Sequence, residues 1–220
     1  MDYITYRTEH YIFHYRPDSP AERDIKLIAD CQEECFKRIT DTLKIYPSFL
    51  FHYWLCDSPE EVGRIYGDND PCNGFAAEPD RVYAVYNDEI QCIGAHEDAH
   101  LVSYLINIPS SCFLREGLAM YFDGSWWGRD NRDWARELYL DKKASSVSAY
   151  MQDDFFYSVD CSISYPIAGA FTAYLLETYG LKRYLTFYSY QDDDWEVHYR
   201  DIFGLSLAEI EEAFLQSLMA

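Results

Sequence analysis

The residues of this chain best suited to chemistry are two histidines and a glutamate in the run HEDAH, which spans His96, Glu97 and His100. Because side chains four positions apart lie on one face of an α-helix, both imidazoles can turn a ring nitrogen toward a single ion. Zinc takes histidine nitrogens at about 2.0–2.1 Å and keeps an open position when it is catalytic. The glutamate beside the first histidine would then lie near a zinc-bound water and could take its proton.

A third ligand is available sixteen residues after His100, at Glu116. It lies in the run FLREGLAMYF (residues 113–122), which predicts a short second helix after a break at residues 107–111. A glutamate on this helix would complete a set of two histidines and one glutamate, which is a ligand composition of hydrolytic zinc sites. The alternative is an ordinary amphipathic helix, expected over residues 87–106, that carries two exposed histidines.

Together, HEDAH and LREGLAMYF resemble the motifs of the gluzincin metallopeptidases, especially the peptidase MA-like group related to aminopeptidase N. The pattern of that group is HExxH followed, after a turn, by W/F-L-x-E-G-L/F-A-x-Y. The resemblance implies one Zn²⁺ per chain, with His96, His100 and Glu116 as ligands and Glu97 as general base and proton shuttle. Metzincins are disfavoured because they need a third histidine close by, and after His100 the next histidine is His198.

The resemblance extends to residues 165–180, YPIAGAFTAYLLETYG, which look like the helix that follows the zinc site in that group. In the aminopeptidase relatives a tyrosine near the start of this helix donates a hydrogen bond to the oxyanion, and Tyr165 is the matching candidate. Such a donor can lower the barrier by about 2.7–4 kcal/mol. The chain has 21 tyrosines, most of which must pack in the core, and Tyr157 is a rival for the role.

One motif of these relatives is missing, because no G-x-M-E-N stretch precedes HEDAH. Since that motif holds the free N-terminus of a substrate, the choice between endopeptidase and aminopeptidase stays open. In gluzincins, an edge strand above the site pairs with extended substrate. Here either residues 72–78 or the alternating segment 81–86 would do so, and either could equally be a plain sheet strand.

The elements around these motifs predict an α+β, zincin-like metallopeptidase fold with a small N-terminal mixed sheet. Strands are expected at residues 9–15, 49–56 and 81–86, a loop at 67–77, and helices at 20–43, with Ser19 as N-cap, and at 58–66, with a capping box. From residue 88 the chain is expected to be mostly helical, ending in a helix over 206–219. The layout predicts one catalytic domain, residues 1–220, with a sheet-bearing lobe over about 1–106, a helical lobe over 107–220 and the active-site cleft between the lobes.

Composition limits the partners and the compartment. With 38 acidic and 18 basic residues, the formal net charge is −20. Such a chain repels phosphate backbones and anionic membrane surfaces, so we expect a peptide or protein substrate and neither nucleic acid nor membrane. The start of the sequence lacks the features of a signal peptide, and the seven cysteines include no C-x-x-C pair, so we expect the cytoplasm. The sequence does not determine the oligomeric state.

We therefore expect a small zinc metallopeptidase that hydrolyses peptide bonds through a metal-bound water activated by Glu97. The alternative in another class is a zinc-bearing domain that binds peptide or protein without turnover. A structural protein with a fortuitous motif would bind no stoichiometric metal. His10 and His14 are expected to face the same side of one strand, where a second metal site is an alternative to ordinary surface histidines.

Overall fold

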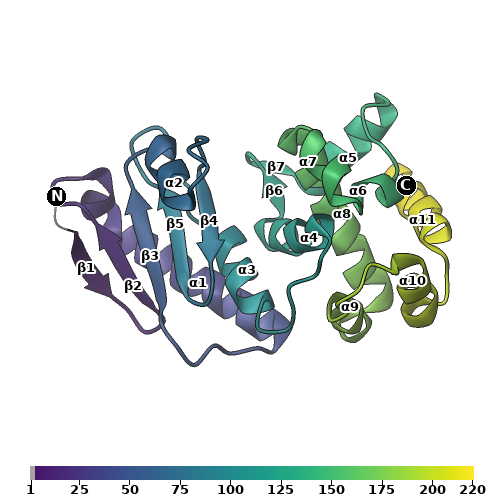
Figure 1. The fold of residues 1–220 in the computed structure, drawn as a ribbon, viewed down its shortest axis with the longest axis horizontal. Helices are drawn as coiled ribbons and strands as arrows, with labels where there is room; N and C mark the ends of the chain where they lie inside the picture. Colours follow the sequence, from purple (N-terminus) through teal and green to yellow (C-terminus); the bar gives the residue numbers. More distant parts are fainter. Residues whose placement is uncertain (1–2) are drawn as a thin grey trace. The chain divides into compact units, whose positions relative to one another are not determined.

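The chain folds into two compact units, Met1–Leu105 and Ile106–Ala220, in a computed structural model that describes residues 3–220 (Figure 1). The first unit contains a mixed sheet with helices, and the second is mostly helical. This confirms the predicted mixed α+β class, whereas the predicted lobe boundaries and cleft stay predictions. No helix within residues 3–220 is long and apolar enough to cross a membrane.

A five-stranded sheet forms the centre of the first unit, with the strand order β1-β2-β3-β5-β4. The inner strands run parallel, whereas β1 and β4 pair antiparallel with their neighbours at the two edges. Strand β5 is therefore paired on both sides, and β4 is an edge strand. The strands are β1 (Ile4–Arg7), β2 (Tyr11–Tyr15), β3 (Phe51–Cys56), β4 (Gly74–Ala77) and β5 (Arg81–Val85).

Helix α1 (Pro20–Leu43) covers one face of this sheet (Figure 1). It begins where the sequence predicts, because the Ser19 side chain accepts a hydrogen bond from the backbone N–H of Glu22 and proline occupies the first turn. Its buried positions recur every three or four residues, as on an amphipathic helix. The Phe36 ring meets the rings of Tyr11 and Phe51 edge-on, at centroid distances of 6.0 and 5.6 Å.

Helix α2 (Pro59–Tyr66) packs on the other face of the sheet (Figure 1). The Ser58 side chain accepts a hydrogen bond from the backbone N–H of Glu61 at 3.3 Å, as predicted. The second half of the predicted capping box is wrong, because the Glu61 carboxylate accepts from the backbone N–H of Asp57 and from the Arg16 guanidinium instead. The Glu61 carboxylate thus bonds the residue before the N-cap and forms an ion pair with Arg16, the residue that follows β2.

Two strands of the sheet differ from the prediction. Strand β1 was not predicted, although Ile4 and Tyr6 alternate with exposed residues in the observed strand. Strand β4 lies inside the predicted loop 67–77. Its sequence GFAA has no β-branched residue, and only its pairing with β5 makes it a strand.

The helix that carries the two histidines is shorter than predicted. Helix α3 spans only His96–Ser103, so the prediction is wrong over residues 87–95. The side chain of Asn87 accepts hydrogen bonds from the backbone N–H groups of Glu89 and Ile90, at 2.8 and 2.7 Å, and this holds a turn rather than a helix. Gly94 then has φ 139°, a backbone conformation that no residue of an α-helix adopts.

The second unit contains eight helices and a short hairpin within the residues that the structure describes. The predicted helix near the C-terminus is confirmed, with Ser206 as its N-cap in a complete capping box. The elements are α4 (Cys112–Asp123), β6 (Ser125–Trp126), β7 (Arg129–Asp130), α5 (Asn131–Leu140), α6 (Val147–Tyr150), α7 (Asp153–Ser158), α8 (Cys161–Tyr179), α9 (Leu181–Tyr188), α10 (Trp195–Phe203) and α11 (Leu207–Met219).

Helices α4 and α8 approach so closely that glycine is required where they cross. A Cβ on Gly117 would lie 2.5 Å from Thr172 Oγ1 and 3.0 Å from the backbone oxygen of Ala168. A Cβ on Gly169 would lie 2.7 Å from Met120 Cβ. These contacts fix the backbone of α4 at the residue that follows Glu116.

Candidate metal centre

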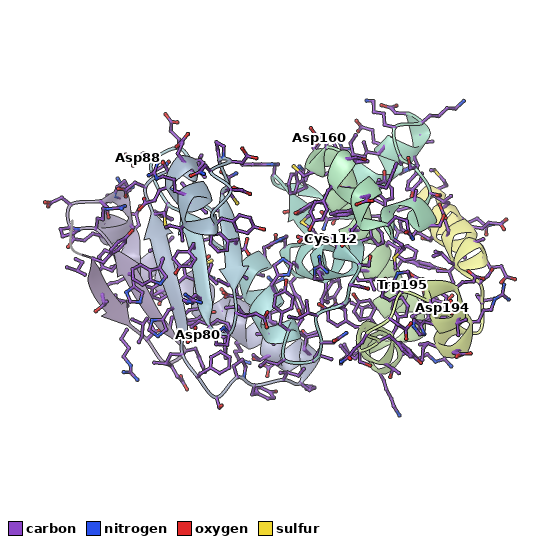
Figure 2. All side chains as sticks on the ribbon, in the orientation of Figure 1. Asp80, Asp88, Cys112, Asp160, Asp194 and Trp195 are labelled. Atoms are coloured by element: carbon purple, nitrogen blue, oxygen red, sulfur yellow. The ribbon has the colours of Figure 1, made fainter. Side chains whose placement is uncertain are left out.

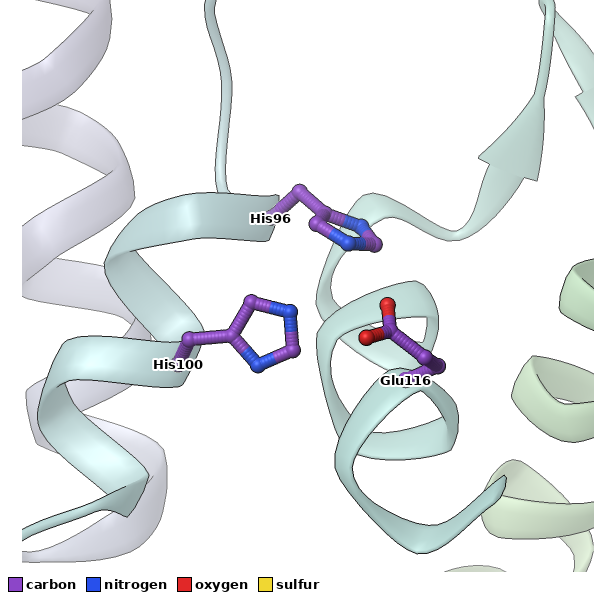
Figure 3. Close-up of side chains that lie close together, drawn as sticks. All are labelled: His96, His100 and Glu116. Atoms are coloured by element: carbon purple, nitrogen blue, oxygen red, sulfur yellow. The ribbon is translucent and has the colours of Figure 1, made fainter. Parts of the chain in front are cut away.

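Helix α3 presents its two histidines on one side, one turn apart (Figure 3). The ring centroids of His96 and His100 are 5.0 Å apart, and the ring planes are inclined by 81°. His100 is buried and His96 is half-buried. Two imidazoles arranged in this way can direct one nitrogen each to a shared ion.

Glu97 lies in the first turn of α3 and is half-buried beside the edge strand β4. A Cβ on Gly74 of β4 would lie 3.2 Å from Glu97 Oε1, 3.3 Å from the backbone oxygen of Tyr83 and 3.4 Å from Cys92 Sγ. The glycine therefore lets β4 pass directly beside the glutamate side chain. Any larger residue at position 74 would press on that carboxylate.

One hydrogen bond at the start of β4 shows which of its residues turn their backbone groups toward β5 and which turn them away. The backbone N–H of Val85 donates to the backbone oxygen of Asn73 at 2.8 Å, which makes these opposite residues a hydrogen-bonded pair. Because such pairs alternate in an antiparallel ladder, the next two residues that turn their backbone groups away from β5 are Gly74 and Ala76. The open edge beside Glu97 therefore carries the N–H and C=O groups of Gly74 and Ala76, and the Gly74 oxygen accepts a hydrogen bond from the Cys72 thiol at 3.1 Å.

Asp98, between the two histidines, is fully buried, and its Oδ2 accepts a hydrogen bond from the Tyr11 hydroxyl at 2.5 Å and from Gln32 Nε2 at 2.9 Å. Burial raises the pKa of the Asp98 carboxyl well above its ordinary value, against the lowering effect of the Tyr11 hydrogen bond. The role of Asp98 was not predicted from the sequence. The available signal was Gln32, which with Thr40 is one of two polar residues on the buried, mainly apolar face of α1.

Glu116 lies on α4, one turn after the N-terminal residue Cys112, which is labelled in Figure 2. Helix α7 holds this turn from two sides. The backbone N–H of Cys112 donates to Asp153 Oδ1 at 2.6 Å, and the Cys112 thiol lies 3.1 Å from the Tyr157 hydroxyl and 4.0 Å from Glu116 Oε1. Burial, and next the nearby Glu116 carboxylate, raise the pKa of the Cys112 thiol to about 11, so the thiol stays protonated at neutral pH.

His96, His100 and Glu116 form a group that could hold a metal ion (Figure 3). Each residue offers one ligand atom, and the three atoms lie within 4.8 Å of one another. Two imidazoles and one carboxylate fit zinc, which accepts nitrogen and oxygen ligands and needs no thiolate. No second group of three or more His, Cys, Asp or Glu residues suited to a metal is found among residues 3–220.

Tyr165 does not lie in the first turn of its helix. Helix α8 begins at Cys161, after the N-cap residue Asp160 that Figure 2 labels, so Tyr165 belongs to the second turn. Its ring packs at 5.4 Å from Trp126 and 5.8 Å from Phe156.

The rival tyrosine, Tyr157, is 69% exposed on α7. Partial burial and the hydrogen bond with Cys112 raise the pKa of Tyr157 to about 12. The Tyr157 phenol therefore keeps its proton at neutral pH, as a hydrogen-bond donor must. The two tyrosines stay rival candidates for the oxyanion donor.

The predicted shared face of His10 and His14 is wrong. His10, just before β2, turns toward α1, where its Nδ1 lies 2.6 Å from Glu33 Oε2. His14 instead lies next to β3, and its Nε2 is 3.0 Å from His52 Nδ1. The contact with α1 overrides the simple alternation of the strand.

No protein-family model matches this chain, and no curated protein matches it. Among solved structures, the chain is similar to an M1 zinc metallopeptidase from Deinococcus radiodurans, with a TM-score of 0.47 and 11% sequence identity. The match covers 97% of this chain and 51% of that chain, so this chain spans about half the length of the protein it matches. A likeness this distant assigns no family.

Proposed function

We propose that this protein is a zinc-dependent peptidase of the gluzincin type. The observation that carries the proposal is the group formed by His96, His100 and Glu116, with Glu97 next to the first histidine in the chain. This donor set is one that hydrolytic zinc sites use. When bound, zinc would polarise the carbonyl group of the substrate and make water more acidic.

Glu97 would act as the general base. Its carboxylate would take a proton from the attacking water and deliver it to the amine that leaves when the peptide bond breaks. Tyr165 would donate a hydrogen bond to the oxygen on which negative charge develops, with Tyr157 as the second candidate. The other residues named above position these groups and would not take part in proton transfer.

The substrate would bind in extended form along β4. Of the two segments that the sequence allowed, β5 is paired on both sides within the sheet, whereas β4 has an open edge. The outward N–H groups of Gly74 and Ala76 and the C=O group of Ala76 would pair with the peptide backbone, which would place the peptide beside Glu97. Recognition through backbone atoms suits a peptide or unfolded protein segment.

The first test is metal content measured by mass spectrometry on dialysed protein, with wild type beside Glu116→Ala. We expect about one zinc per chain in the wild type and a large loss in the variant, because zinc needs three protein ligands. No zinc in the wild type after incubation with the metal would refute the proposal.

Turnover is the second test. Wild type and Glu97→Gln would be compared on a library of peptides, each with a free and an acetylated N-terminus. We expect the variant to keep its zinc and to lose cleavage, because the amide cannot accept the proton. Cleavage of acetylated peptides would assign an endopeptidase. Zinc without cleavage of any peptide would favour the alternative, a zinc-bearing domain that binds peptides without turnover.

The cytoplasm stays the proposed location. All seven cysteines are free thiols in the structure, which agrees with a reducing compartment.

A further inference from the structure

We propose that the buried side chains of Tyr11, Gln32 and Asp98 form an anchor that sets the orientation of α3 and thereby the zinc affinity of His96 and His100. The part that concerns zinc rests on the proposed function. The part that concerns α3 does not depend on a metal. All three anchor residues are fully buried, and they come from β2, α1 and α3 of the same unit.

Helix α3 needs an external anchor because it is short and has no N-terminal cap of its own. It spans eight residues, and its N-cap residue Ala95 makes no side-chain hydrogen bond to the helix. Isolated helices shorter than about 12–15 residues are marginal in water, so packing must decide how α3 lies. A helix that carries two metal ligands must also be fixed in rotation about its own axis.

Gln32 holds the chain just before the helix. Its Nε2 donates to the backbone oxygen of Gly94 at 3.0 Å, and the backbone N–H of Gly94 donates to its Oε1 at 2.8 Å. These two bonds attach both backbone groups of one residue to α1. Gly94 lies two residues before His96, so the entry point of α3 is fixed.

Asp98 holds the helix itself. Its Oδ2 receives hydrogen bonds from Gln32 Nε2 at 2.9 Å and from the Tyr11 hydroxyl at 2.5 Å, and the same hydroxyl lies 3.1 Å from the backbone oxygen of Gln32. One oxygen of Asp98, on α3, is therefore bonded to residues of both the sheet and helix α1. A fully buried polar group that loses its hydrogen-bond partner is left unsatisfied, so these bonds resist displacement.

The position of Asp98 explains how the anchor acts without touching a metal. Successive residues of an α-helix are about 100° apart around its axis, so Asp98 points about 160° away from each histidine, which lie two residues before and after it. The anchor therefore contacts the face of α3 opposite the two histidines and leaves the histidine face open. If α3 turned or frayed, the two imidazoles would lose their common direction.

The test measures α3 directly and zinc separately, in the full chain. Amide hydrogen exchange rates would be measured without metal in the wild type, in Tyr11→Phe and in the control Tyr53→Phe. In each protein the rates of residues 95–103 would be compared with those of β3. Tyr53 is equally buried in the same core, but its hydroxyl donates to the backbone oxygen of Cys92, at 3.4 Å, and not to Asp98. We expect Tyr11→Phe to speed exchange in residues 95–103 about tenfold more than in β3, and the control to show no such preference.

Zinc affinity would be measured by competition with a chromophoric chelator. We expect the dissociation constant to rise about tenfold in Tyr11→Phe, in Gln32→Glu and in Asp98→Asn, the lower end of the range for residues that orient metal ligands. The combined variant Gln32→Glu with Asp98→Asn should bind zinc more tightly than expected if the affinity losses of the two single variants were additive. The reason is that the new amide at 98 can donate a hydrogen bond to the new carboxylate at 32.

The outcomes separate the two proposals. The proposed anchor would be refuted if Tyr11→Phe changed amide exchange equally in residues 95–103 and in β3. It would also be refuted if the variants bound zinc as tightly as the wild type. A wild type that retains no zinc would overturn the proposed function, and the exchange comparison would still decide whether Tyr11 and Asp98 hold α3.

Discussion

The substitution Gly169→Ala tests whether the close crossing of α8 and α4 stabilises the second unit. The added methyl would lie 2.7 Å from Met120 Cβ and 2.7 Å from Asn131 Nδ2. Carbon atoms in contact are about 3.5–4.0 Å apart, so the two helices must separate by roughly 1 Å. Met120 Cβ cannot rotate away, because it is bonded directly to the backbone of α4.

The size of the effect follows from three contributions. Overpacking a buried contact costs about 1–3 kcal/mol. Displacing Asn131 weakens the hydrogen bond from its Nδ2 to the backbone oxygen of Met120, now 2.8 Å long, at a cost of about 1 kcal/mol. Alanine has a higher helix propensity than glycine by about 1 kcal/mol, which offsets the second term. The free energy of unfolding should therefore fall by about 1–3 kcal/mol.

Urea unfolding followed by circular dichroism would measure this loss, with Gly117→Ala as the matched control. At Gly117 the shortest contact is to Thr172 Oγ1, which can rotate, and the next is the backbone oxygen of Ala168 at 3.0 Å. The control should therefore lose less than Gly169→Ala. A Gly169→Ala variant as stable as the wild type would refute the reasoning, because helix propensity would then outweigh the crossing.

Three further predictions concern other parts of the molecule. Gly74→Ala should lower peptide turnover about tenfold at unchanged zinc content, because the added methyl would lie 3.2 Å from Glu97 Oε1 and displace that carboxylate. Turnover equal to that of the wild type would contradict this prediction. Burial and the neighbouring His52 lower the pKa of His14 from 6.5 to about 4, so the unfolded chain takes up the proton first as the pH falls. The free energy of unfolding should thus drop by about 1–2 kcal/mol between pH 6.5 and 4, after allowance for solvent screening of this half-exposed ring. In urea titrations at these pH values, His14→Phe should not show this drop. Ser206→Ala should lower the free energy of unfolding by about 1 kcal/mol by removing the capping box of α11, seen as a lower Tm.

Elements with local signals were predictable from the sequence. Helix α1 has a serine N-cap, a proline in the first turn and a regular apolar face, and its observed bounds equal the predicted ones. Helix α11 has the same kind of start. These signals act within four residues, so no knowledge of the rest of the chain is needed.

Elements decided by distant contacts were not predictable in the same way. The apolar residues near Ile90 resemble a helix, but the Asn87 turn and the backbone of Gly94 prevent one. Strand β4 depends on its pairing with β5. In both cases the preference of the local sequence is weaker than the tertiary contact that opposes or creates the structure.

The candidate site shows the same division. The group His96, His100 and Glu116 was evident from spacing and motif, and the structure gathers these residues into one group that could hold a metal. The role of Asp98 was not evident, because its partners Gln32 and Tyr11 lie 66 and 87 residues away in the chain. A single sequence holds no sign of which distant residues meet.

The two short edge strands also bear on how this protein behaves at high concentration. An exposed strand edge can pair with a second copy of the chain and begin a continuous sheet. Here β1 and β4 have only four residues each, β1 exposes Arg7, and β4 is followed at once by Glu78 and Pro79, a residue without a backbone N–H. A charge on one edge and a proline after the other would limit self-association to a few weak bonds. An edge long enough for a brief pairing with one peptide is thus too short to polymerise.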